Sequence, residues 1–103
     1  EKANEQHYDT PAAFFELVLG RRLKYSACSW SAARRLDEAE EESLALTCER
    51  AELSDGMDIL ELGCGWGSML MGLARAFPDA RLIGVERSTL PWAAAWLRRL
   101  LLQ

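Results

Sequence analysis

Apolar and polar residues alternate along this chain with two different periods, which predict both helices and strands. Helices are indicated where apolar side chains recur every three to four residues, and strands where a short apolar run follows a turn signal. Glycine, proline and an Asp-Gly pair mark the ends of these segments. The predicted elements are a helix over 12–19, a helix near 38–52, a strand over 57–62, a helix over 68–77 and a strand over 80–85.

The first predicted helix has clear boundary signals. Thr10 is suited to cap it, Pro11 suits the first helical position, and Gly20 is suited to end it. Its predicted apolar face consists of Phe14, Leu17 and Val18. We expect this face to pack against the rest of the molecule.

The segment 24–35 has no clear period and is predicted to be a loop. Trp30 is expected to be its large apolar anchor, and packing is favoured over a role in ligand binding. The acidic run 37–42 follows this loop. Asp37 and Glu40 resemble a capping-box pair at the start of a helix, where acids are favoured, and the run is predicted to form a solvated face.

The end of the chain predicts a further amphipathic helix. Trp92, Trp96 and Leu100 recur at four-residue spacing, with two arginines partly opposite. We expect this stripe to pack in a core. Self-association and attachment to a membrane surface are the alternatives.

The sequence LELGCGWGS at 60–68 places three glycines two residues apart, between the first strand and the following helix. The chain must reverse there within a few residues, and glycine permits positive φ and close approach of a ligand to backbone N–H groups. Gly63, Gly65 and Gly67 are therefore predicted to form a turn that binds an adenosine-bearing ligand. The carboxylate of Glu61, at the tip of the strand, is suited to the ammonium group of an amino-acid-like ligand.

Several cofactors bind glycine turns, and the spacing separates them. A P-loop needs a Lys followed by Ser or Thr, and no Lys occurs after Lys24, so this class is excluded. A dinucleotide fingerprint needs G-x-G-x-x-G or A. Counting from Gly63 gives Gly65 and then Ser68, with the bulky Trp66 between them, so this match is imperfect.

A second carboxylate, Glu86, follows the second predicted strand, about twenty residues beyond the turn, where a βαβ unit delivers its next strand end. A carboxylate in this place accepts hydrogen bonds from both hydroxyls of a ribose. NAD and S-adenosylmethionine would use Glu86 in the same way, so it supports adenosine binding without choosing between them. The alternative is that Glu86 is a solvated acid at a strand end.

Several stretches in a fixed order resemble one family. NEQHYDTPAAFFELVLGRRLKYSACSW, then LDEAEEESLALTCERA and DILELGCGWGS, are similar to the cyclopropane-fatty-acyl-phospholipid synthase and mycolic-acid cyclopropane synthase superfamily, and most of all to its coclaurine N-methyltransferase-like branch. The resemblance runs from about Asn4 to Val85. It implies a class I S-adenosylmethionine-dependent methyltransferase: an α/β, partial Rossmann-like fold, with N-terminal helices followed by β-α-β-α.

The resemblance also implies roles for individual residues. Tyr25 and Ser26 are expected to close over the cofactor, Gly63 and Gly65 to underlie it, and Glu61 to lie near its methionine end.

Two departures from the family pattern limit these roles. Ala27 stands where the cyclopropane-forming members often have a Cys that helps to hold a bicarbonate-type base, and Cys28 comes one position later, so simple methyl transfer is favoured over cyclopropanation. Pro91 stands where the family usually has a Gln that contacts the adenosine end.

At 103 residues the chain is short for a methyltransferase core, which needs about 200 residues or more. We expect the N-terminal portion of such an enzyme, with a helical lid or cap over 1–54 and an incomplete β-α-β-α part of the cofactor domain over 55–103. The predicted function is methyl transfer from S-adenosylmethionine to a small-molecule amine or lipid-like acceptor, with an unknown catalytic base. The alternative is an inactive form that acts as an interaction or oligomerisation module through the Trp92/Trp96 helix.

Composition and charge exclude other classes. Half of the residues are apolar and the formal net charge is −4, so no basic field favours nucleic acid. The cysteines Cys28, Cys48 and Cys64 do not have the spacing of a zinc site or a disulfide framework, and Cys48 is expected to pack in a core. His7 is expected to be structural or exposed rather than a general base. No leader or membrane-spanning run is evident, and a cytoplasmic location is expected.

Overall fold

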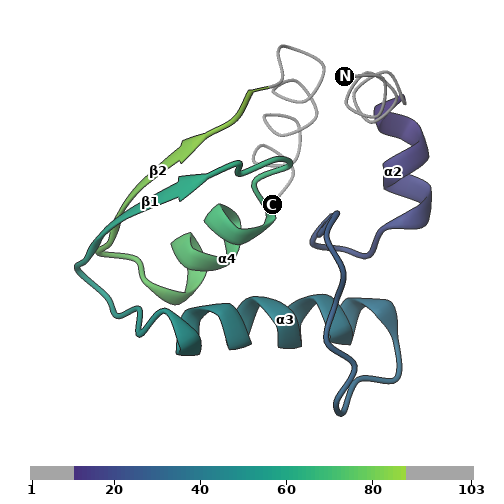
Figure 1. Cartoon of the computed structure of the whole chain (residues 1–103), viewed down its shortest axis with the longest axis horizontal. Helices are drawn as coiled ribbons and strands as arrows, with labels where there is room; N and C mark the ends of the chain where they lie inside the picture. Colours follow the sequence, from purple (N-terminus) through teal and green to yellow (C-terminus); the bar gives the residue numbers. More distant parts are fainter. Residues whose placement is uncertain (1–10, 88–103) are drawn as a thin grey trace.

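The computed structural model describes residues 11–87 and contains the five elements that the pattern predicts (Figure 1). They are α2 (Ala12–Val18), α3 (Leu36–Arg50), β1 (Asp58–Leu62), α4 (Ser68–Ala76) and β2 (Arg81–Val85). The predicted boundaries agree with these to within two residues. The predicted cap Thr10, the segment around His7, and the tail with Pro91, Trp92 and Trp96 lie outside the described residues.

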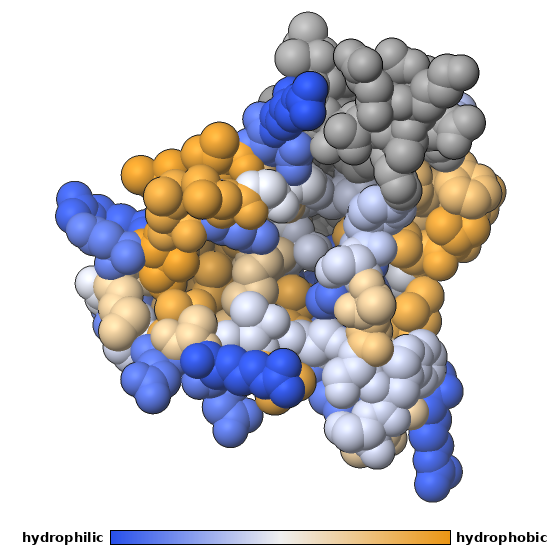
Figure 2. All heavy atoms as spheres, viewed as in Figure 1, coloured by the Kyte–Doolittle hydropathy of each residue, from blue (hydrophilic) through white to orange (hydrophobic). Residues whose placement is uncertain are grey.

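The two strands form a parallel pair that α4 connects and covers on one face. In the register of the pair, Leu60 lies opposite Ile83 and Leu62 lies opposite Val85. Successive side chains of a strand point to opposite faces, so these four share the face away from α4. All four are exposed, and Figure 2 shows apolar side chains gathered over the strands.

The covered face depends on Gly84 in β2. A Cβ at this position would collide with Cδ1 of Leu70 on α4 and would lie 2.9 Å from Sγ of Cys64. The absence of a side chain therefore allows α4 and the preceding turn to lie directly on the strand. In the same helix Leu73 is buried, and Leu44 of α3 approaches the backbone at Gly72.

A small aromatic core connects α2 to the turn before α4. Phe15, Leu23 and Trp66 are each almost fully buried against one another. The ring centroids of Phe15 and Trp66 lie 5.8 Å apart, and Phe15 meets the ring of Tyr25 edge-on at 5.1 Å. Burial of each large apolar side chain is worth about 1.5–3 kcal/mol. This core therefore fixes the N-terminal segment beside the glycine turn.

The predicted apolar face of α2 is wrong. Phe15 is the buried residue of this helix, whereas Phe14, Leu17 and Val18 are exposed. The helix packs on the core through Phe15, and Ala12 and Leu19 at its two ends also lie against this core. The helix begins with Pro11 at its N-cap position and ends with Leu19, in extended conformation, as its C-cap, one residue before Gly20.

The acidic start of α3 is only in part the solvated face that the sequence predicts, because Glu38 and Glu41 are exposed while Glu40 is buried. Its carboxylates accept hydrogen bonds from backbone N–H groups of the preceding loop. Asp37 binds the amide of Arg21, Glu40 binds those of Arg22 and Lys24, and Glu42 binds those of Ser31, Ala32 and Ala33. A loop without regular structure must satisfy its amides in some way, and here the acids of α3 do so.

The capping box of α3 also lies elsewhere than predicted. Arg35 is the N-cap residue, and the Glu38 side chain accepts from its backbone N–H at 3.3 Å. The predicted pair Asp37 and Glu40 instead binds the loop, because the helix begins at Leu36, two residues earlier than the sequence suggests.

Two packing predictions have different outcomes. The segment 24–35 is a loop as predicted, but Trp30 is not its apolar anchor, since 52% of its surface is exposed. Cys48, which the sequence predicts to pack in a core, is half-buried one helical turn after the buried Leu44. Within residues 11–87, no helix has the length and apolar character needed to cross a lipid bilayer.

Candidate functional site

The three glycines lie in the turn between β1 and α4, as predicted. Gly63, Gly65 and Gly67 have φ of 72°, 51° and 75°, all in the left-handed region that favours glycine. The N–H groups of Gly63 and Cys64 both donate to the carbonyl of Val85, at 2.7 and 3.1 Å. These bonds hold the turn against the end of β2, so the turn and the second strand form one unit.

The turn leaves its backbone accessible. Among residues 11–87, no atom lies within 4 Å of the position that a Cβ on Gly63 would occupy, and the nearest to a Cβ on Gly65 is Oε2 of Glu86 at 3.8 Å. Both glycines are exposed. A ligand can therefore lie directly on the backbone here, which is the geometry that a glycine-rich nucleotide turn requires.

Glu86 follows β2 and reaches back over the turn. Its Oε2 accepts a hydrogen bond from the N–H of Gly65 at 2.6 Å, and its Oε1 accepts from the N–H of Arg87 at 2.7 Å. The residue is partly exposed, and the two bonds give its carboxylate a defined place over the turn, which favours the ligand-binding interpretation over that of a solvated strand-end acid. A carboxylate has about four lone-pair positions, so these two bonds are compatible with acceptance from ribose hydroxyls.

Glu61 lies near the end of β1, on the same side of the molecule as the turn. Its Oε2 is buried and has no hydrogen-bond partner among the described residues. Burial raises the pKa of this carboxyl above its ordinary value, a hydrogen bond from the Leu70 backbone opposes the shift, and the nearby charge of Glu86 adds to it. A half-buried carboxylate with an unsatisfied oxygen is suited to a cationic group.

Cys64 fills the inner side of the turn. Its Sγ and Cβ lie against the backbone of Gly84, as expected of a small residue in this place. Burial raises the pKa of its thiol, and the charges of Glu61 and Glu86 raise it further. The thiol is therefore kept protonated, which favours packing over nucleophilic chemistry.

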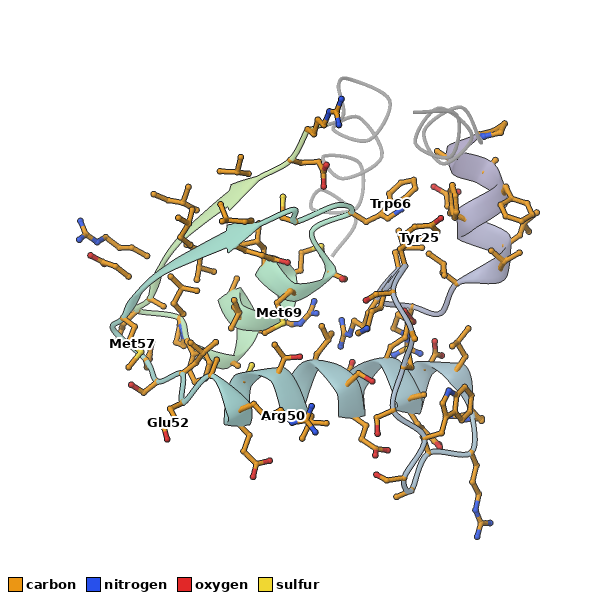
Figure 3. The ribbon with its side chains drawn as sticks, in the orientation of Figure 1. Tyr25, Arg50, Glu52, Met57, Trp66 and Met69 are labelled. Atoms are coloured by element: carbon orange, nitrogen blue, oxygen red, sulfur yellow. The ribbon has the colours of Figure 1, made fainter. Side chains whose placement is uncertain are left out.

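Tyr25 lies on the loop before α3 and next to the turn. Figure 3 shows its side chain beside Trp66, between α2 and the strand-to-helix turn, and the Phe15 ring contacts both. About half of the Tyr25 side chain is exposed. The adjacent Ser26 is exposed, and its hydroxyl accepts a hydrogen bond from Nζ of Lys24 at 2.7 Å.

Two participants are not predicted by the sequence. The spacing argument marks Trp66 only as a bulky residue that disturbs a dinucleotide pattern, yet it connects the turn to α2. Phe15 falls on no predicted face, although it contacts both Trp66 and Tyr25. Within the described residues, no group of three or more His, Cys, Asp and Glu side chains is arranged to hold a metal ion.

Comparison with known proteins gives consistent matches. Residues 1–93 match the mycolic acid cyclopropane synthetase family. The chain is 36% identical over 86 residues to (S)-tetrahydroprotoberberine N-methyltransferase of Eschscholzia californica, and these cover 82% of the chain and 25% of that protein. It is 33% identical over 84 residues to cyclopropane-fatty-acyl-phospholipid synthase of Escherichia coli K12, covering 82% of the chain and 22% of the synthase.

A solved structure agrees with these matches. The crystal structure of coclaurine N-methyltransferase bound to N-methylheliamine and SAH superposes with a TM-score of 0.81 and 34% identity. The superposition covers 91% of this chain and 27% of that one. The predicted α/β, partial Rossmann-like methyltransferase fold is thereby confirmed. The chain spans about a quarter of the length of the curated relatives it matches.

Proposed function

Because the chain belongs to the mycolic acid cyclopropane synthetase family, we propose that it forms the cofactor-binding part of an S-adenosylmethionine-dependent methyltransferase. One observation carries the proposal. Three left-handed glycines follow β1, and the carboxylate after β2 is hydrogen-bonded to the central glycine of the three. The glycine turn and Glu86 together present an accessible backbone surface and a carboxylate suited to a ribose.

Each site residue has a role in this proposal. Gly63 and Gly65 supply the surface on which the cofactor lies, and Gly67 turns the chain into α4. Glu86 accepts from the ribose hydroxyls, and Glu61 faces the ammonium of the methionine moiety. When bound, the cofactor supplies a methyl group on a sulfonium, and alignment with an acceptor is the main requirement for its transfer.

Tyr25 and Ser26 complete the cofactor site from the N-terminal side. Tyr25 is held by the Phe15 ring close to Trp66 of the glycine turn, so the loop that carries both residues lies beside the proposed cofactor surface. This placement supports the assignment of residues 1–54 as a cap and of residues 55–103 as the start of the cofactor domain.

S-adenosylmethionine is favoured over a dinucleotide for two reasons. The buried, unsatisfied Oε2 of Glu61 suits a cationic amino-acid group, which NAD lacks. The related coclaurine N-methyltransferase was solved with SAH, the demethylated form of the cofactor.

The proposed acceptor is a small-molecule amine or a lipid-like nucleophile. Relatives of both kinds occur among the matches, namely N-methyltransferases and a cyclopropane-fatty-acyl-phospholipid synthase. Ala27 replaces the Cys that cyclopropane-forming members often carry, so methyl transfer to an amine is the favoured reaction. The cytoplasmic location stays a prediction.

Calorimetry with S-adenosylhomocysteine tests the proposal, and the chain offers a matched pair of glycines. Gly63 and Gly56 have φ of 72° and 78°, and in the described part of the chain neither has an atom within 4 Å of the position that a Cβ would occupy. Valine costs similar backbone strain at both, but only Gly63 lies in the turn. We expect Gly63→Val to weaken binding more than about tenfold, which is about 1.4 kcal/mol.

The control Gly56→Val should lower thermal stability to a similar extent and leave affinity unchanged. Absence of S-adenosylhomocysteine binding by the folded protein would contradict the proposed function. Preferential binding of NAD would indicate a dinucleotide site instead.

A further inference from the structure

Glu40 of α3 is a buried acid to which neither the family resemblance nor the proposed cofactor contacts give a role. Its exposed fraction is 0%. One carboxylate oxygen accepts from the N–H of Arg22 at 3.2 Å, and the other accepts from the N–H of Lys24 at 2.6 Å. A buried carboxylate is costly unless it is hydrogen-bonded, so these amides explain why the charge is tolerated.

The segment that Glu40 binds has an unfavourable backbone conformation. Leu23 lies between the two bonded amides and has φ of 51°, in the left-handed region that a bulky residue rarely adopts. This conformation costs free energy, because it brings Cβ close to the following carbonyl oxygen. It places the Leu23 side chain in the core with Phe15 and Trp66. Hydrogen bonds from both flanking amides to one buried carboxylate offset this cost.

The fit around the carboxylate is close. A Cβ on Gly20 would collide with Oε1 of Glu40 and would lie 2.8 Å from Oδ1 of Asp37. The N–H of Leu23 donates to the carbonyl of Gly20 at 3.0 Å, which closes the turn above the acid. The approach of the carboxylate therefore requires glycine at this position. The helix α2 does end just before it, at its C-cap Leu19, but Gly20 does not adopt the left-handed conformation of a helix-ending glycine.

Lys24 connects Glu40 to the segment that carries Tyr25 and Ser26. Its N–H is bound by Glu40, while its Nζ donates to the carbonyl of Ser26 at 3.3 Å, to the Ser26 hydroxyl at 2.7 Å and to the carbonyl of Ala27 at 2.8 Å. Tyr25 lies between the two anchored residues, with its ring against Phe15. Glu40 thus fixes the residue that in turn fixes Ser26 and its neighbours.

We propose that Glu40 is a positioning residue of the cofactor site, which holds the Arg22 and Lys24 amides so that Tyr25 and Ser26 lie beside the glycine turn. This inference rests on the proposed function, because it gives Glu40 its effect through a cofactor contact. Glu40 does not touch the cofactor and acts through Lys24. A neutral amide in its place can accept from one of the two N–H groups but presents its own NH₂ to the other.

Amide hydrogen exchange tests the local part of the proposal without any cofactor. In Glu40→Gln we expect faster exchange at the amide of Arg22 or of Lys24, with unchanged exchange in β1 and β2. Glu49→Gln, an exposed change on the same helix, is the control and should alter neither amide. Unchanged protection of both amides in Glu40→Gln would overturn the proposal.

Calorimetry with S-adenosylhomocysteine tests the functional part. We expect Glu40→Gln to weaken binding on the order of tenfold, the scale of one lost hydrogen bond to a charged acceptor. Gly20→Ala, which displaces the carboxylate without removing it, should weaken binding similarly. Glu49→Gln should bind as the unmodified protein does. Wild-type affinity in both Glu40→Gln and Gly20→Ala would overturn the proposal.

A double-mutant cycle separates positioning from general destabilisation. If Glu40 acts through the Tyr25 loop, Glu40→Gln should add little to the loss of affinity caused by Tyr25→Ala. Fully additive losses would overturn the proposal, because they would show that Glu40 acts on binding independently of Tyr25. If the unmodified protein does not bind S-adenosylhomocysteine, the proposed function is refuted instead. The exchange experiment would still show whether Glu40 holds the amides of Arg22 and Lys24.

Discussion

The N–H of Gly65 donates a hydrogen bond of 2.6 Å to the carboxylate of Glu86, which lies 21 residues later in the chain. The bond fixes the acid that follows β2 over the turn that follows β1. The segment after β1 and the segment after β2 therefore hold each other in place. A ligand that lies on the glycines must meet the same carboxylate.

Replacement of Glu86 by glutamine is expected to weaken binding of S-adenosylhomocysteine by about tenfold to a hundredfold, because a charged acceptor for the ribose hydroxyls is lost. The loss should be smaller for an analogue that lacks the ribose 2′-hydroxyl, which calorimetry on both ligands measures. Asp79→Asn removes an exposed charge from the loop before β2 and serves as the control. An equal loss for both ligands would show that Glu86 does not bind that hydroxyl.

Gly84→Ala is expected to destabilise the protein by about 1–3 kcal/mol, because the added methyl group overpacks the interface between α4 and β2. The methyl would meet Leu70 and Cys64, both held by the surrounding structure. Gly72→Ala is the matched control in α4, since its Cβ would make ordinary contact with Leu44 at 3.7 Å.

At Gly72 the change should increase stability by about 0.5–1 kcal/mol, the usual gain from alanine inside a helix. Urea denaturation of both variants checks this opposite pair of effects. A Gly84→Ala protein as stable as the unmodified one would show that α4 can move away from the sheet without cost.

The strand-to-helix turn can be predicted from sequence because its requirements are local. Glycines two residues apart, between an apolar run and a helix signal, need left-handed conformations that other residues avoid, and Gly63, Gly65 and Gly67 all adopt them. The position of Glu86 follows from the length of one βαβ unit. Both inferences depend on covalent geometry and chain length, which the sequence contains directly.

The loop before α3 cannot be predicted in the same way. An acidic helix face has the same sequence whether it meets water or backbone amides, so the prediction of a solvated acidic run fails at Asp37, Glu40 and Glu42, which bind the loop. The spacing does contain one indication. Glu40 shares a helix face with Ser43 and Leu44, three and four positions later, and all three are buried. An acid on such a stripe indicates a buried partner.

The choice between Phe14 and Phe15 is also beyond the sequence. The two rings are adjacent and chemically identical, and a helix of seven residues does not fix which side it presents. Phe15 is the buried ring because it packs against Trp66, which lies more than fifty positions away in the sequence. Contacts of this kind are set by tertiary packing.

Glu61→Gln is expected to make the protein more stable near neutral pH and to weaken its binding of S-adenosylhomocysteine. Burial raises the pKa of Glu61 above its ordinary value of 4.5, so the folded state binds this proton more tightly than the unfolded state. The resulting stabilisation is present below the ordinary pKa and is lost as pH rises through the raised pKa. Glutamine resembles the protonated acid and avoids that loss.

Thermal denaturation across pH checks the sign of this effect. The stability gained in Glu61→Gln should shrink as pH falls through the raised pKa of Glu61, because the unmodified side chain then becomes neutral as well. Glu49→Gln, exposed on α3, should change the midpoint little. A less stable Glu61→Gln protein at neutral pH would mean that the ionised carboxylate is satisfied in the fold.

Glu42→Gln is expected to have the opposite sign. The Ser31 hydroxyl and the amides of Ala32, Ala33 and Ser31 lower the pKa of Glu42 below 4.5, against a smaller effect of burial. Its stabilisation is therefore present above the ordinary pKa and is lost as pH falls through the lowered one. The variant should be less stable than the unmodified protein near pH 7, and the difference should decrease as pH falls through the lowered pKa, as thermal denaturation at a series of pH values would show. If the difference in stability stays constant with pH, the effect comes from packing of the Glu42 side chain and not from its charge. The charge of Glu42 would then not stabilise the loop.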